Sequence, residues 1–343
     1  MKLIDATVNS SSRPLIGTSL GMIMAKRKDP VQERQRKREL WINRTMQWSG
    51  LSRAEVEARL AQTRTQSFRL NPLMDGEVAP DLLARQITWC PNGYEIIPEH
   101  LADYQQLADS GRGYIQNAAS WLPVLALAPA AGERILDLCA APGGKSSHIQ
   151  ALANGQANLV CNDNSKPRLM KLQANLKRLN VSAEYMLADA RNLSRRQLEA
   201  FDKILLDAPC SGEGLMSLNA SDTPLFDSWS VAHIRRLSDL QKRLILEAWR
   251  LLKPGGTLVY STCTMAPEEN EAVVDWLLRR QSDASLVPID IAPLPHRVPV
   301  VQSWNDRAFT HDLSGCLRLM PGRLTEAFFV AAFRKTTLAE SMV

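Results

Sequence analysis

From Tyr114 to Cys263, segments with a helical pattern alternate with segments that have the pattern of strands. Because strands joined by helices lie parallel to one another, this alternation predicts a parallel sheet with helices on both faces. Ligands of such sheets bind at the carboxyl ends of the strands, so residues that follow a strand are the first candidates for function. The predicted strands are 134–138, 159–161, 183–187, 203–209 and 257–263, and the predicted helices are 118–126, 146–153, 167–179, 195–200 and 231–252.

The first strand–helix junction, residues 136–153, reads LDLCAAPGGKSSHIQALA. An apolar strand runs into a turn of small residues, after which Lys145 opens the helix. Gly143 and Gly144 have no Cβ, so a ligand can reach the backbone and the unpaired N–H groups at the helix start. About 20 residues later Asp163 ends the next apolar run, where an acid binds ribose hydroxyls in dinucleotide and adenosyl sites. The junction therefore predicts a nucleotide-like ligand.

Three acids fall at predicted strand ends: Asp163, Asp189 in LADAR and Asp207 in LLDAPCSGEG. Singly, each of them fits a turn or a helix cap as well as a site. Together they match an adenosylmethionine-like cofactor, which needs an acceptor for its ribose, a polar partner for its adenine and a carboxylate near the reacting centre.

The six cysteines stand singly, without a CxxC pair, which argues against a zinc site or a disulfide framework and indicates a reducing, cytosolic setting. Cys139 and Cys161 fit small buried hydrophobes. Cys210 and Cys263 differ from them, since both follow predicted strands close to Asp207, near a helix start that favours a thiolate.

A cofactor pocket, a carboxylate and a thiol together suit one reaction. Carbon 5 of a cytosine or uracil is a poor nucleophile, but a thiolate that adds to carbon 6 makes an enamine, which can attack an electrophilic methyl group. A second group must then remove the proton from carbon 5 so that the thiol can leave. The predicted pocket, carboxylate and thiol match that reaction.

The motifs LDLCAAPGGK, NDNSKPR, LLDAPCSGEG and YSTCTMAPEENE, in this order and spacing, resemble those of the Sun (Fmu-like) family of RNA cytosine-5 methyltransferases. The similarity runs from about residue 40 to Lys335. It implies an α/β, Rossmann-like methyltransferase with a mostly parallel, doubly wound sheet, preceded by a small α/β RRM-like module that binds RNA. It also implies S-adenosylmethionine as the cofactor.

The resemblance further implies roles for single residues. Cys263, in the STC motif, would be the nucleophile, and Cys210 would assist release of the methylated product. Asp207 would hold the target cytosine near the methionine end of the cofactor. Two departures from the family pattern are Asn117, where a QD pair is common, and Ala327, where a glycine is common. The implied cofactor contacts are Cys139, Ala140, Ala141, Pro142, Gly143, Gly144, Lys145, Asp163, Arg168, Asp189 and Asp207.

These patterns divide the chain into three parts. Residues 1–39 are expected to be a flexible basic extension, 40–110 the RNA-binding module and 111–343 the catalytic domain. In the module, Ser52 and Glu55 form a predicted capping box, and strand-like pieces at 65–73 and 87–98 flank a short helical segment. The basic run 26–38 fits either a solvated helix face or a contact for nucleic-acid phosphates.

The net charge and the apolar segments of the chain bear on its partners and on its relation to membranes. A net charge of +5 suits a polyanionic partner without requiring one, and the apolar run 15–24, broken by glycines, is too short for a membrane span. We expect a cytoplasmic monomer, without a metal or a membrane anchor, that methylates structured RNA, above all ribosomal RNA. Two alternatives stay open: the same chemistry on transfer RNA or another base, and a non-catalytic RNA-binding or ribosome-assembly factor on the same scaffold. A small-molecule methyltransferase would explain neither the paired cysteines nor the basic N-terminal region.

Overall fold

The computed structural model describes residues 29–195, 198–219, 224–291 and 294–337, so the expected extension lies outside the described residues up to residue 28. Within the described ranges no helix has both the length and the apolar character needed to cross a membrane.

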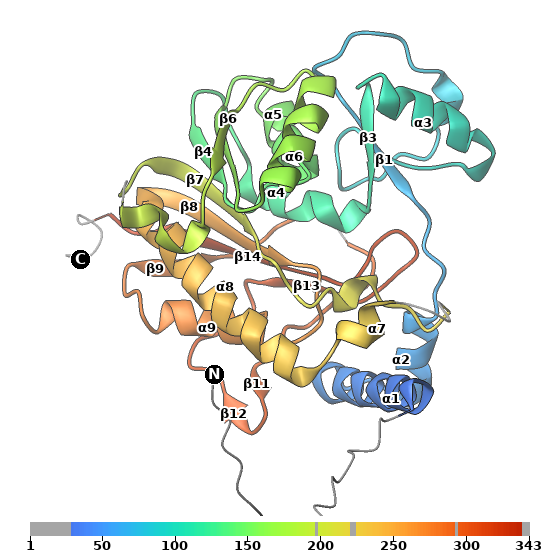
Figure 1. Ribbon diagram of the computed structural model, residues 1–343, viewed down its shortest axis with the longest axis vertical. Coiled ribbons are helices and arrows are strands. Elements are labelled where there is room, and N and C mark those ends of the chain that lie inside the picture. Colours follow the sequence, from blue (N-terminus) through green and yellow to red (C-terminus); the bar gives the residue numbers. More distant parts are fainter. Residues whose placement is uncertain (1–28, 196–197, 220–223, 292–293, 338–343) are drawn as a thin grey trace, which may run out of the picture.

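A nine-stranded sheet forms the centre of the molecule (Figure 1). Its five parallel strands lie in the order β6-β5-β4-β7-β8, and β14 then runs antiparallel to β8. The prediction of a mostly parallel sheet is confirmed, with antiparallel strands added at one side. The strands are β4 Arg134–Asp137, β5 Asn158–Asp163, β6 Glu184–Leu187, β7 Phe201–Asp207, β8 Leu252–Thr262, β9 Ala284–Val287, β10 Arg297–Val298, β13 Leu317–Leu319 and β14 Phe328–Lys335.

Helices cover both faces of this sheet, because successive strand residues point to opposite sides and both are apolar. In β4, Ile135 packs into one core with α4, α5 and α6, whereas Leu136 packs into the other with α8 and α9. The helices are α4 Leu122–Leu127, α5 Gly144–Leu152, α6 Lys166–Arg178, α8 Val231–Leu251 and α9 Glu271–Leu278. The strand order reverses at β4, so its carboxyl end and those of its neighbours open into the crevice where ligands of doubly wound sheets bind.

A small antiparallel sheet precedes the large one in the chain. Its order is β2-β1-β3, with β1 at Ser67–Leu70, β2 at Gly93–Glu95 and β3 at Gly113–Gln116. Helix α3, Leu101–Asp109, packs on it around Phe68 and Tyr104. The boundary expected after residue 110 runs through this sheet, since β3 lies beyond it. The sheet also has three strands among the described residues, one fewer than an RRM.

Helices α1, Pro30–Ser49, and α2, Arg53–Leu60, lie apart from this sheet, beside α7, Pro224–Ser228 (Figure 1). The predicted capping box of Ser52 and Glu55 is present at the start of α2. Trp41 and Val56 pack with Trp229 and Met265, so the two helices belong to the core of the methyltransferase domain. Their apolar faces have no counterpart in the small sheet, whereas the predicted division had placed 40–60 with it.

The described part of the basic run contacts the protein itself. Lys37 Nζ donates to the carbonyls of Phe226 and Asp227 at 3.0 and 2.7 Å, and Arg34 pairs with the Asp227 carboxylate at 2.6 Å. Arg36 pairs with Glu33 one turn away at 2.7 Å. The sequence left a solvated helix face and a contact for phosphates as alternatives; in the structure these three side chains pair with groups of the chain itself.

Two connecting regions differ from the prediction. Residues 190–195 form a 3-10 helix and β7 begins at Phe201, where a helix was expected over 195–200. The proline-rich stretch before β14 contains β9, β10 and β13, together with a hairpin of β11, Ser303–Trp304, and β12, Arg307–Ala308. Strands of two to four residues leave almost no periodic signal in a sequence, so these were missed.

Candidate active site

The turn between β4 and α5 is shaped by its two glycines. Gly143 has φ +106° and caps α5, and a Cβ on it would lie 2.8 Å from Leu172. A Cβ on Gly144 would lie 2.7 Å from Gln116 Oε1. Helix α6 supports the turn, since Arg168 Nη2 donates a hydrogen bond to the Ala141 carbonyl at 3.0 Å. The turn therefore presents its backbone to the crevice, as its sequence predicts.

A cavity of about 570 Å³ opens at the carboxyl ends of β4, β5 and β7. This volume is in the range of small-molecule sites. The three predicted acids all line it. Asp163 is buried, accepts from the Ser165 amide at 2.9 Å and lies 3.3 Å from Arg168 Nη2. Asp189 is half-buried and paired with Arg191 at 2.6 Å. The hydrogen bonds from Arg191 lower the pKa of Asp189.

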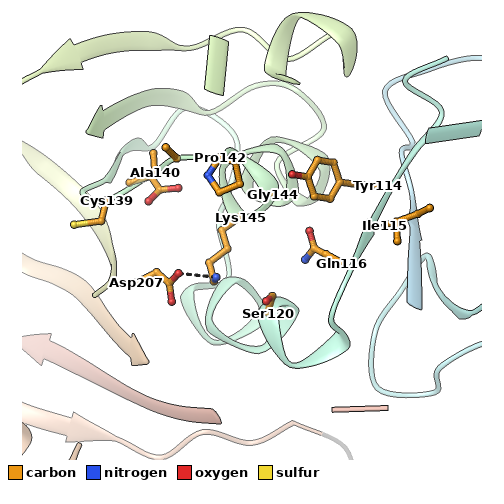
Figure 2. Close-up of a pocket in the computed structure, with 12 residues that line it drawn as sticks. Tyr114, Ile115, Gln116, Ser120, Cys139, Ala140, Pro142, Gly144, Lys145 and Asp207 are labelled. Atoms are coloured by element: carbon orange, nitrogen blue, oxygen red, sulfur yellow. Dashed lines mark hydrogen bonds and ion pairs between the residues drawn. The ribbon is translucent and has the colours of Figure 1, made fainter. Parts of the chain in front are cut away.

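A second cavity of about 240 Å³ lies between the glycine turn and the small sheet (Figure 2). Lys145 and Asp207 meet in its wall, with Nζ 2.7 Å from Oδ2. Burial lowers the pKa of Lys145, but the Asp207 carboxylate more than offsets this, so that the net shift is upward. Ser261 Oγ donates to the other Asp207 oxygen at 2.8 Å. Gln116, from β3, also lines this cavity.

Two buried polar groups at this wall lack partners among the described residues. Asp137 Oδ2 accepts from Ser146 Oγ at 2.7 Å, but its Oδ1 has no hydrogen bond. Neither the oxygen nor the nitrogen of the Gln116 amide has one. Burial raises the pKa of Asp137 to about 7. Unpaired buried groups are costly, and at a cavity wall they point to a polar ligand.

The two predicted cysteines come together at the far end of the larger cavity. Cys210 Sγ lies 3.2 Å from Cys263 Sγ, and both residues line that cavity with Asp207. The hydrogen bond between the two sulfurs, together with burial, raises the pKa of Cys210 well above that of a free thiol. Cys210 therefore retains its proton.

Comparison with known proteins places this architecture in a family. The family model described as 16S rRNA methyltransferase RsmB/F matches residues 124–334. The chain belongs to this family. A tRNA (cytosine(49)-C(5))-methyltransferase of Pyrococcus abyssi is 38% identical over 253 residues, 73% of this chain and 79% of the relative. A ribosomal RNA small subunit methyltransferase F of Cronobacter sakazakii is 36% identical over 300 residues, 84% of this chain and 56% of the relative.

A solved structure agrees with this placement. The structure of a methyltransferase homolog protein from Pyrococcus horikoshii superimposes on this chain with a TM-score of 0.73 and 29% sequence identity. The match covers 90% of this chain and 99% of the Pyrococcus horikoshii chain. The predicted family and the Rossmann-like methyltransferase fold are thus confirmed. The chain spans a little more than half the length of the ribosomal RNA relative named above.

Nearly all of the predicted cofactor residues of this RsmB/F-family chain line one of the two cavities, and Cys139 lines both. Gly143 is the exception. Its Cα faces Leu172 and Leu176 of α6, so it serves the packing and conformation of the turn. The sequence prediction gave no role to Gln116, although β3 carries it to the cavity wall.

The YSTCTMAPEENE motif ends in the run Glu268, Glu269, Asn270 and Glu271, for which the sequence predicted no role. The three glutamates anchor the segment after Cys263 to three other parts of the protein, and Asn270 bonds to Thr262 and Thr264 on either side of Cys263. Glu268 pairs with Arg44 of α1 at 2.7 Å, and Glu271 pairs with Arg318 of β13 at 2.6 Å. The sequence offered only the composition of this run as a sign of its role. An acidic run at a helix start predicts an exposed N-terminal turn. In the structure, however, Glu269, Asn270 and Glu271 are fully buried.

Proposed function

We propose that this chain transfers the methyl group of S-adenosylmethionine to carbon 5 of a cytosine in structured RNA. The observation that carries the proposal is the cysteine pair, with sulfurs 3.2 Å apart beside Asp207 in a cavity that the strand-end acids also line. The names of the relatives support the chemistry and include both a ribosomal and a transfer RNA enzyme. We propose ribosomal RNA as the substrate, because ribosomal RNA names the matched family.

The chain's own groups fit this cofactor, which supplies an electrophilic methyl group when bound. Asp163 and Asp189, after β5 and β6, would hold the adenosyl end, and the glycine turn would hold the methionine end. The unpaired Asp137 Oδ1 is a buried acceptor at that end and suits an ammonium group. Arg168 would further enclose the adenosyl end. Its guanidinium pairs with Asp163 and donates a hydrogen bond to the Ala141 carbonyl in the turn.

The cysteines divide the work on the base. The Cys263 thiolate would add to carbon 6, and the electron pair this places on carbon 5 would form the new bond to the methyl carbon while the bond between that carbon and the cofactor sulfur breaks, with its electron pair going to the sulfur. The carbon 5 proton is then removed, the bond between carbon 6 and sulfur breaks, and Cys263 leaves as a thiolate. Cys210, at 3.2 Å, is the group placed to assist this elimination. Asp207, fixed by Lys145 and Ser261, would hold the base between them.

The target cytosine must leave its helix to reach Cys263, because the carbon 6 face is covered in a stacked duplex. The small sheet borders the site, since β3 carries Gln116 into the wall of the smaller cavity, which also contains Asp207. We propose that the module of β1, β2 and β3 contacts the RNA, that the protein acts as a monomer and that it works in the cytoplasm.

Replacing either cysteine tests the proposal. With Cys263→Ala, methyl transfer to RNA should be lost while calorimetry still shows cofactor binding, since Cys263 is needed only for the bond to carbon 6. With Cys210→Ala, elimination should slow and a covalent RNA adduct should appear on denaturing gels. Near-normal turnover by the first variant would exclude Cys263 as the nucleophile. Cofactor binding without any transfer by the native chain to total RNA would favour the non-catalytic alternative.

A further inference from the structure

A polar cluster lies next to the two cysteines. It consists of Ser211, which lines the larger cavity, and the buried side chains of Gln241, Thr264 and Glu269. Glu269 is at its centre. One carboxylate oxygen accepts from the Ser211 amide at 3.0 Å and from Gln241 Nε2 at 2.8 Å, and the other accepts from Ser211 Oγ. Glu269 has no exposed surface and lines neither cavity, so it is not in place to touch a ligand.

The cluster holds the chain on both sides of Cys210. Ser211, the next residue, is bound through its amide and its hydroxyl. Pro209, the preceding residue, is bound through its carbonyl, which accepts from Gln241 Nε2 at 2.9 Å. Since α8 supplies Gln241 and the start of α9 supplies Glu269, the backbone around Cys210 is fixed between two helices.

The same cluster reaches the segment of Cys263. Ser211 Oγ lies 2.8 Å from Thr264 Oγ1, which directly follows Cys263. Cys263 also has support of its own. Its carbonyl accepts from the Gly214 amide at 2.9 Å, and the adjacent Thr262 is paired with Phe329 in the sheet. Loss of the cluster would therefore loosen Cys210 more than Cys263.

Burying the carboxyl group of Glu269 costs free energy, because its charged form loses hydration. Burial raises its pKa to about 7 despite the hydrogen bonds from Ser211, and the nearby Glu213 carboxylate raises it further. A buried carboxyl group without a ligand contact destabilises a fold unless its hydrogen bonds are needed. Three of its four side-chain hydrogen bonds go to the segment of Cys210 and to the glutamine that supports it, and the longest, from Thr264 Oγ1 at 3.4 Å, goes to the segment of Cys263.

We infer that Glu269 and Gln241 are positioning residues that hold Cys210 opposite Cys263, and that they act on product release rather than on methyl transfer. The inference rests on the proposed function, because release is the step assigned to Cys210. It predicts that variants at these positions resemble Cys210→Ala, although neither residue reaches the substrate.

The test uses the full-length chain with Glu269→Gln and, separately, Gln241→Met. Glutamine keeps the shape of Glu269 but offers one acceptor oxygen in place of two, so it cannot accept all four hydrogen bonds that the carboxylate accepts. The matched control is Glu247→Gln, a buried glutamate of the same helix α8 that accepts from the Ser194 amide and touches neither cysteine segment. Thermal unfolding of each variant checks that it folds.

Three measurements are made on each variant: methyl transfer in a single turnover, the amount of covalent RNA adduct on denaturing gels, and the rate of steady-state turnover. In both variants we expect single-turnover transfer close to native and accumulated adduct. Steady-state turnover should fall about tenfold, as the loss of a buried hydrogen bond predicts. The control should behave as the native chain.

Native release in Glu269→Gln and Gln241→Met, while Cys210→Ala accumulates adduct, would overturn the inference. So would an equal loss of single-turnover transfer and of release, because this indicates a general structural role. Failure of the native chain and of Cys210→Ala to form any adduct or product would instead count against the proposed function. If Glu269→Gln does not fold, Gln241→Met decides the question alone.

Discussion

At the scale of single residues, Gly214 shows how tightly the cysteine segment is packed. A Cβ at this position would lie 2.3 Å from the Ala327 carbonyl oxygen and 2.8 Å from that of Cys263. Both are backbone atoms of neighbouring segments, so neither can move away as a side chain would. We expect Gly214→Ala to destabilise the fold by about 1–3 kcal/mol, measured by urea unfolding, and to displace Cys263.

Gly315 provides the control for this substitution. A Cβ there would have its nearest contact at 3.6 Å, with Pro288, which is an ordinary packing distance. Gly315→Ala should change the free energy of unfolding by less than about 0.5 kcal/mol. Equal effects of the two substitutions would show that the contacts of Gly214 do not limit the fold.

The meeting of the two cysteines could be predicted from the sequence, although 53 residues separate them. Each follows a strand of the parallel sheet, and the register of β7 and β8 sets Asp207 beside Ser261. The parts played by Gln116 and Glu269 could not be predicted. Gln116 reaches the site through antiparallel pairing of β3 with β1, and Glu269 through contacts with α8 and the segment of Cys210. Such long-range pairings leave no local pattern in a sequence.

At the scale of elements, α1, α9 and β13 are joined through one buried ion pair. Arg318 of β13 and Glu271 of α9 are 1% and 0% exposed in their side chains. Arg318 also donates to the Met265 carbonyl at 2.9 Å and lies 4.2 Å from the Trp48 ring centre of α1. The pair therefore ties the segment after Cys263 to the sheet and to the N-terminal helices.

Removing one partner of this pair should be costly. Arg318→Met leaves the Glu271 carboxylate buried without its cation, and we expect a loss of about 3–5 kcal/mol in the free energy of unfolding. The double variant Arg318→Met with Glu271→Gln removes the unpaired charge and should regain a large part of that loss. Denaturant unfolding of the two single variants and the double variant measures this coupling. Additive losses would contradict it.

The five parallel strands and the longer helices beside them followed from periodicity, whereas the assignment of segments to domains did not. Strand β3 was expected to belong with the segments that follow it, because it adjoins them in the chain. In the fold it pairs with β1. Likewise, α1 and α2 precede the small sheet in the chain but pack against Trp229 and Met265. Proximity along the chain predicts neighbours in space only where connections are short.

At the scale of the whole molecule, three buried carboxyl groups near the active site share a raised pKa of about 7: those of Asp137, Glu269 and Glu326. For each, burial is the largest cause, since it disfavours the charged form. Cations near Glu326, on Lys145 and Arg64, oppose the shift without cancelling it. The stability that these three groups contribute near Cys210 and Cys263 therefore depends on pH.

Glu326→Gln isolates one of these contributions. The pKa of Glu326 is about 7 in the folded chain against an ordinary value of 4.5, so the folded state binds more protons between these two pH values. Stability from this group is therefore full below pH 4.5, falls as the pH rises towards 7, and is constant above. The loss is on the order of 3 kcal/mol. A glutamine does not titrate, so Glu326→Gln should gain stability relative to the native chain from pH 5 to 8. Urea unfolding across this range measures the difference, with the exposed Glu99→Gln as a control that should show none. A difference independent of pH at position 326 would mean that its carboxyl group is ionised throughout.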